Sequence, residues 1–106
     1  MDESELAAVF KVLSVETRLR ILSMLEDGPL CVNALASRLG VTAAAVSQHL
    51  RILRNAGAVK HRRCGNHVHY SLDGRTLARW KSLLDGLLAS AASPRKGCCP
   101  DELCKD

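Results

Sequence analysis

Apolar residues recur at intervals of three and four along most of the chain, which is the spacing of amphipathic helices. The spacing predicts helices over residues 3–13, 15–25, 32–39, 43–56 and 74–92. Ser14 is expected to cap the second of these helices. Its buried positions are expected to be Leu19, Ile21, Leu22 and Leu25.

Two features between the helices add to this picture. Residues 32–39 and 43–56 are separated by three residues, with Gly40 placed to end one helix and Thr42 to cap the next, which predicts a helix-turn-helix. Residues 59–63 and 67–72 flank a Cys-Gly-Asn turn and predict a β-hairpin. We therefore expect a mainly α domain with a small hairpin over residues 1–92, followed by a tail over residues 93–106.

The last predicted helix carries an apolar seam that is too long to bury under so small a domain. The chain has one Phe, one Tyr and one Trp, so its core is built from smaller aliphatic residues and is thin for a monomer. We expect the seam to pair with a second copy, together with the first helix, in a homodimer. The alternative is that the seam belongs to the core of the single chain. The predicted interface residues are Leu6, Phe10, Leu77, Trp80, Leu84 and Leu87.

Charge is segregated along the sequence. The net charge is +4, yet residues 28–72 contain no Asp or Glu, and all 11 acidic residues lie outside that window. A surface that lies along phosphates has this character, because carboxylates would repel DNA and each cation releases counterions. Chance clustering in a basic chain is the alternative. The window holds Arg38, Arg51, Arg54, Lys60, Arg62 and Arg63.

The helix over residues 43–56 is the predicted reading element. Val46, Leu50 and either Ile52 or Leu53 are expected to face inward. Small residues on the outer face let the backbone enter the major groove, and Ser47 and Gln48 can hydrogen-bond base edges there. The partner is therefore expected to be double-stranded DNA.

Other residues are expected to position the duplex without reading its sequence. Thr42 stands at a helix N-terminus and suits a phosphate. Arginines of the helix and hairpin suit further phosphates, whereas His49 either joins them or packs at the base of the helix. The predicted DNA-binding residues are Thr42, Ala44, Ala45, Ser47, Gln48, His49, Arg51, Arg54, Arg62, Arg63 and His67.

The five cysteines are unevenly placed, at Cys31, Cys64, Cys98, Cys99 and Cys104. No apolar stretch is long enough to span a membrane, and the acidic start MDESEL is unlike a signal peptide, so the expected compartment is the cytoplasm. In a reducing compartment, an odd and clustered set of thiols indicates metal binding or redox activity rather than a disulfide framework.

The run VSQHLRILRNAGAV follows a helix-turn-helix start and precedes a basic hairpin ending in HYSL. Over residues 5–92 the chain resembles the winged-helix repressors of the ArsR/SmtB family. The resemblance implies a winged helix-turn-helix of five helices plus a wing, dimeric through the first and last helices. It also implies that operator DNA is released when a metal or metalloid binds, or when a thiol pair oxidises.

The resemblance makes two missing sites informative. Arsenic-responsive members often carry ELCVCDL at the third helix, where this chain has Cys31 but Asn33 in place of the second cysteine. Zinc-sensing members carry Asp and His ligands on the last helix, where Asp73 is followed by Arg75 and no His occurs after His69. Both sites are therefore expected to be inactive.

The remaining candidate sensor is the tail, whose three thiols suit a soft ion of low coordination number. We expect trivalent arsenic or antimony as the inducer, bound by Cys98, Cys99 and Cys104, with no organic cofactor. Cadmium, lead, methylated arsenicals or an oxidant acting on the first two thiols are alternatives. A ligand-independent architectural DNA-binding protein is another, and an enzyme such as a thiol-dependent arsenate reductase is disfavoured because no phosphate-cradling loop adjoins a cysteine.

Overall fold

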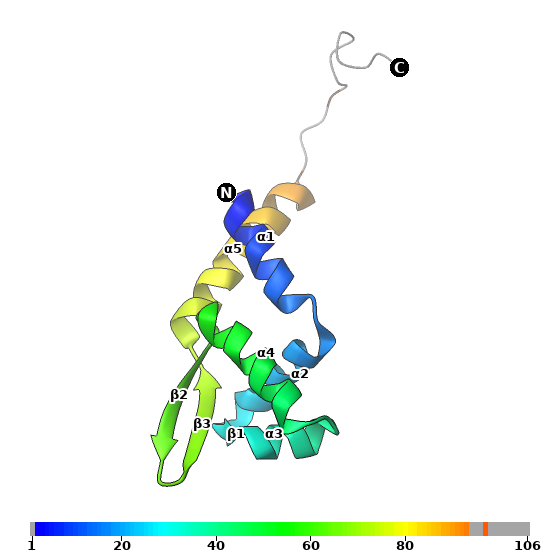
Figure 1. The fold of residues 1–106 in the computed structure, drawn as a ribbon. Helices are drawn as coiled ribbons and strands as arrows, with labels where there is room; N and C mark the ends of the chain where they lie inside the picture. The colour runs from blue at the N-terminus through cyan, green and yellow to red at the C-terminus, as the bar shows by residue number, and fades with distance from the viewer. Residues whose placement is uncertain (1, 94–96, 98–106) are drawn as a thin grey trace.

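The computed structural model describes residues 2–93 and residue 97 (Figure 1). The predicted helices and hairpin are present, and their bounds differ from the expected ones by at most one residue. The elements in chain order are α1 (Glu3–Leu13), α2 (Glu16–Met24), the short 3₁₀ turn η1 (Leu25–Asp27), β1 (Leu30–Cys31), α3 (Val32–Leu39), α4 (Ala43–Asn55), β2 (Val59–Cys64), β3 (His67–Leu72) and α5 (Gly74–Ala92).

Side chains cap three of the helices. The carboxylate of Asp2 accepts a hydrogen bond from the backbone of α1, and Asp73 accepts two from the first turn of α5. The expected cap of α2 is wrong, because Ser14 donates its hydroxyl backward to the carbonyl of Lys11, at 3.0 Å. Val15 takes the N-cap position of α2 without a side-chain hydrogen bond. Ser14 therefore ends α1 rather than beginning α2.

The hairpin belongs to a three-stranded antiparallel sheet in the order β1-β3-β2. Strand β1 pairs Leu30 with Tyr70 and Cys31 with His69. The sequence did not predict this strand, because two residues are too few to show an alternating pattern. Its pairing joins β3 to the start of α3, which ties the hairpin to the helical body.

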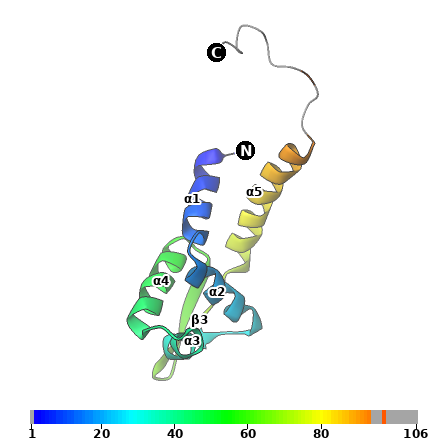
Figure 2. The ribbon, with the colours of Figure 1, turned by 90° about the vertical axis from the view of Figure 1, so that its right-hand side faces the viewer.

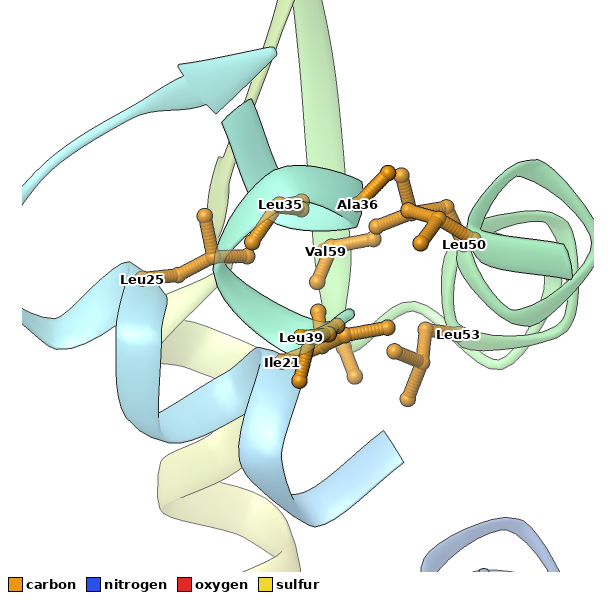
Figure 3. Packing of buried hydrophobic residues seen from close by; sticks show 10 residues of the cluster. Ile21, Leu25, Leu35, Ala36, Leu39, Leu50, Leu53 and Val59 are labelled. Carbon is orange, nitrogen blue, oxygen red and sulfur yellow. The ribbon is translucent and has the colours of Figure 1, made fainter. Parts of the chain in front are cut away.

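The core lies where α2, α3, α4 and β2 meet (Figure 3). Leu53 rather than Ile52 completes the inward face of α4, because Leu53 is fully buried. The expected burial of Leu19 is wrong, since its side chain is 49% exposed in the single chain. The most deeply buried large side chains are Ile21, Leu35, Val46, Leu50 and Leu53.

Helices α1 and α5 extend from the helical body at the end opposite the wing tip (Figures 1 and 2). Arg79 of α5 donates two hydrogen bonds to the Glu5 carboxylate of α1, at 2.6 and 2.8 Å. These hydrogen bonds, and then the charge of Glu5, raise the pKa of Arg79. No residue of α5 is fully buried in the single chain, although Leu77 and Trp80 are partly buried against the core cluster.

Candidate DNA-binding surface

The turn between α3 and α4 sets the direction of the second helix. Gly40 has a φ of 70°, the left-handed conformation that glycine adopts most readily, and its N–H donates to the Ala36 carbonyl at 2.9 Å. Two residues later the Thr42 hydroxyl accepts a hydrogen bond from the Ala45 N–H, at 3.1 Å. The turn and cap predicted from the sequence are thus confirmed, and α4 begins with a fixed orientation against α3.

Burial on one side of α4 decides what its other side presents. Val46, Leu50 and Leu53 have no exposed surface, and they hold the helix against α2 and α3. Because these positions are three and four residues apart, the remaining face must point outward. That face carries the exposed Ala44, Ser47, Gln48 and Arg51, with Ala45 half-buried beside them. Side chains able to hydrogen-bond base edges are therefore at the surface of α4.

His49 lies apart from this face. It is half-buried, and its Nδ1 accepts a hydrogen bond from Nε of Arg18 at 3.3 Å. The same arginine donates to the carbonyl of Val12, at 3.2 Å. The contact joins α2 to α4, which matches the packing role that the sequence left open for His49. His49 is therefore not part of the outward face of α4.

The wing divides its cations between two faces. Successive residues of a strand point to opposite sides, so Arg62 and Arg63 project from opposite faces of the hairpin. Residues paired across antiparallel strands share a face, which places Arg62 with His69, and Cys64 with His67, on the same side. Arg62, Arg63 and His67 are all exposed. A DNA duplex that lies along one face of the hairpin would therefore be closer to the cations of that face than to those of the other.

A hollow between α4 and the wing holds side chains that the sequence reasoning missed. Its lining includes Arg51, Arg54 and Tyr70, with Ser47 and Leu50, and we call it the helix–wing recess. At its edge Nη1 of Arg54 lies 3.1 Å from Nδ1 of His61, and the His61 ring lies 5.8 Å from the ring of Tyr70. The β2–β3 register pairs His61 with Tyr70, and the sequence pattern alone did not predict this pairing.

The cations of this surface have no carboxylate partners in the part of the chain that the structure describes. Both of its ion pairs, Arg79 with Glu5 and Lys81 with Asp85, involve α5. Residues 28–72, which include α4 and the hairpin, contribute no acid. The positive charge of α4 and the wing is therefore available to an external anion.

The structure places two of the five thiols. Cys31 is half-buried at the start of α3, and Cys64 is exposed at the wing tip. Among residues 2–93 and 97, no three His, Cys, Asp or Glu side chains gather as a metal site would require. Within the same residues, no helix is both long and apolar enough to cross a membrane. The predicted sensor residues Cys98, Cys99 and Cys104 lie outside the described residues.

Comparison with known proteins identifies the family. The sequence profile described as "Bacterial regulatory protein, arsR family" matches residues 16–61. The "Transcriptional repressor SmtB homolog" of Synechocystis sp. is 40% identical over 92 residues, which span 85% of this chain and 70% of the relative.

Solved structures agree with this assignment. A "possible transcriptional regulator for arsenical resistance" superposes with a TM-score of 0.71 at 33% identity, covering 81% of this chain and 96% of the other. A homodimeric winged helix-turn-helix DNA-binding domain from Mycobacterium bovis has a TM-score of 0.66 at 28% identity, covering 90% and 88%.

These findings confirm the predicted fold, a winged helix-turn-helix with five helices and a small antiparallel hairpin. The relatives are transcriptional regulators, which also confirms that the chain is not an enzyme. In helix-turn-helix proteins the second helix lies in the major groove, and in this chain that helix is α4. The chain belongs to the ArsR family of bacterial regulatory proteins, also called the ArsR/SmtB family, and is a transcriptional regulator.

Proposed function

We propose that the protein is a cytoplasmic, homodimeric repressor. It binds a palindromic operator through α4 and the wing, and it releases the operator when trivalent arsenic or antimony binds Cys98, Cys99 and Cys104. The observation that carries the DNA-binding part is the outward face of α4, which is polar, cationic and free of acids beside an equally acid-free wing.

On this surface the roles differ by chemistry. Ser47 and Gln48 lie near the middle of the exposed face of α4, where they can reach base edges once small residues at the helix start enter the groove. Thr42 stands at the N-terminus of the helix, whose free N–H groups attract a phosphate. The remaining residues of this surface bind the phosphate backbone of the DNA on either side of the groove. The proposed contacts are Thr42, Ala44, Ala45, Ser47, Gln48, Arg51, Arg54, Arg62, Arg63 and His67.

The dimer follows from an uncovered apolar groove between α1, α2 and α5. Its lining is almost entirely aliphatic or aromatic, and Phe10 and Leu19 remain 43% and 49% exposed in it. A second copy covering the groove would bury the part of the α5 seam that stays exposed in the single chain. Two-fold symmetry would also place two α4 helices on successive turns of one face of DNA. The proposed interface residues are Leu6, Phe10, Leu77, Trp80, Leu84 and Leu87.

The inducer is proposed from the chemistry of the tail. Three thiolates within seven residues match the three-sulfur preference of trivalent arsenic, and soft ligands of this kind favour soft ions. The similarity to a possible transcriptional regulator for arsenical resistance supports a role in the response to arsenic. Because the tail follows α5, a helix of the proposed interface, an ion that binds one arrangement of the dimer more tightly shifts the population toward that arrangement.

Single serine substitutions test the sensor. Cys98→Ser, Cys99→Ser and Cys104→Ser should each bind operator DNA normally, yet require far more arsenite for release in a gel-shift titration, because a hydroxyl replaces a soft donor poorly. Cys31→Ser and Cys64→Ser are the matched controls and should respond like the parent. A normal arsenite response of Cys104→Ser together with a lost response of Cys31→Ser would move the sensor to the start of α3.

The same three thiols also suit a second class of inducer, which includes cadmium, lead and methylated arsenicals, and the vicinal pair suits an oxidant. Titration of the operator complex with arsenite, antimonite, cadmium, lead, zinc and peroxide ranks these inputs by the concentration that releases half of the DNA. Retention of the operator under every one of them would instead favour a ligand-independent architectural protein.

A further inference from the structure

The helix–wing recess has the composition of an anion site. Its walls carry the guanidinium groups of Arg51 and Arg54, the hydroxyl of Ser47 and the phenol of Tyr70, over a floor that includes Leu50. Guanidinium and hydroxyl groups are donors to phosphate oxygens, and among residues 2–93 and 97 none of these side chains has a carboxylate partner. With a volume of about 200 Å³, the recess has room for one phosphodiester group.

The arginine at the edge of this recess is held from the wing. Arginine can only donate hydrogen bonds, so in the 3.1 Å contact Nδ1 of His61 must accept from Nη1 of Arg54. This hydrogen bond requires the tautomer of His61 whose Nδ1 carries no proton. A long arginine side chain loses several rotamers when it binds an anion, and a partner that fixes it beforehand reduces that loss.

His61 is itself supported by the core. Its ring packs against Tyr70, its cross-strand partner, with centroids 5.8 Å apart. Tyr70 in turn packs against the buried cluster that includes Leu50 of α4. The core thus orients Tyr70, Tyr70 supports the ring of His61, and His61 holds the guanidinium of Arg54. This chain of contacts joins the wing to α4, so the two DNA-facing elements hold a fixed relation at this point.

We propose that the helix–wing recess binds one phosphate of the DNA backbone, with Arg54 and the Tyr70 hydroxyl as ligands and His61 as the residue that positions Arg54. The proposal deepens the proposed function and rests on it. It adds His61 and Tyr70 to the DNA-binding machinery, and it makes the wing a support for α4 as well as a contact to DNA.

A double-mutant cycle tests the positioning role. His61→Phe keeps an aromatic ring against Tyr70 but removes the acceptor, and it should weaken operator and random DNA alike, on the order of fivefold. Arg54→Ala should weaken both and lower the slope of log affinity against log salt by about 0.9. The double variant should bind like Arg54→Ala alone. Additive losses in the double variant would overturn the proposal, because His61 would then act independently of Arg54.

A conservative variant separates positioning from folding. His61→Asn places an amide oxygen near the former position of Nδ1, so it should restore most of the affinity that His61→Phe loses. His69→Phe makes the same change on the opposite face of the hairpin, away from the recess, and should retain parental affinity. If His61→Asn binds as weakly as His61→Phe while both melt at the parental temperature, the hydrogen bond to Arg54 does not support binding.

Replacing single phosphates locates the ligand. A set of operator duplexes is prepared, each with one phosphate replaced by an uncharged methylphosphonate. At one position per half-site the replacement should lower the affinity of the parent protein. The same replacement should not lower the affinity of Arg54→Ala any further. Arg62→Ala, on the wing, should still sense that position. Equal sensitivity of the parent and Arg54→Ala at every position would overturn the recess as a phosphate site. A parent that binds operator no better than random DNA would instead overturn the proposed function, while the cycle on random DNA would still test His61.

Discussion

Replacing Phe10 by Ala tests the proposed dimer, and its cost can be worked out from the structure. Phe10 lines the apolar groove between α1, α2 and α5, and its side chain is 43% exposed in the single chain. An aromatic side chain offers roughly 200 Å², so a partner subunit would cover about 90 Å², worth about 2 kcal/mol. Because a two-fold interface contains the residue twice, the dimer should lose about 4 kcal/mol, or roughly a thousandfold in dissociation constant.

Sedimentation equilibrium over a range of protein concentrations measures this constant directly. The Phe10→Ala protein should sediment as a folded monomer at concentrations where the parent is a dimer, and its operator affinity should become dependent on protein concentration. Val41→Ala is the matched control, since Val41 is 39% exposed but lies in the turn between α3 and α4 and does not line the groove. A parental dissociation constant for Phe10→Ala would show that this groove is not the dimer interface.

Three further substitutions test the DNA-reading helix and its supports. Gln48→Ala should cost about 1–3 kcal/mol on operator DNA and little on random DNA in filter binding, and an equal loss on both would contradict base reading. Leu50→Ala empties a fully buried position of α4 and should lower the free energy of unfolding in urea by about 2–5 kcal/mol. Asp73→Ala removes the acceptor for the N–H groups of Arg75 and Thr76 and should destabilise the protein by about 1 kcal/mol in thermal melts, with no loss expected if the cap contributes nothing.

Local patterns in the sequence were enough to place the helices and the hairpin. Helical spacing, the Gly40 turn and the Thr42 and Asp73 positions depend on residues a few places apart, so they can be recognised in one dimension. The exception is Ser14, which lies between two helices. Its hydroxyl donates to the last turn of α1 and does not cap α2. The side of α4 that faces the solvent was also predictable, because burial of one face of a helix determines the other.

Contacts between distant segments were decided only by the tertiary structure. Strand β1 forms because Leu30 and Cys31 pair with Tyr70 and His69, which lie some forty residues later in the chain. A segment of two residues carries no pattern from which this pairing could be predicted. Leu19 fits an apolar helix face, yet it borders a groove that the single chain leaves open. The hydrogen bonds from Arg18 to His49 and between Arg54 and His61 join separate elements, so only packing could bring them together.

The sequence by itself determined the helix-turn-helix, the hairpin and the absence of acids from the DNA-facing window, since these are properties of neighbouring residues. The recess between helix and wing came from the fold, because its position depends on how the core orients Tyr70 against α4.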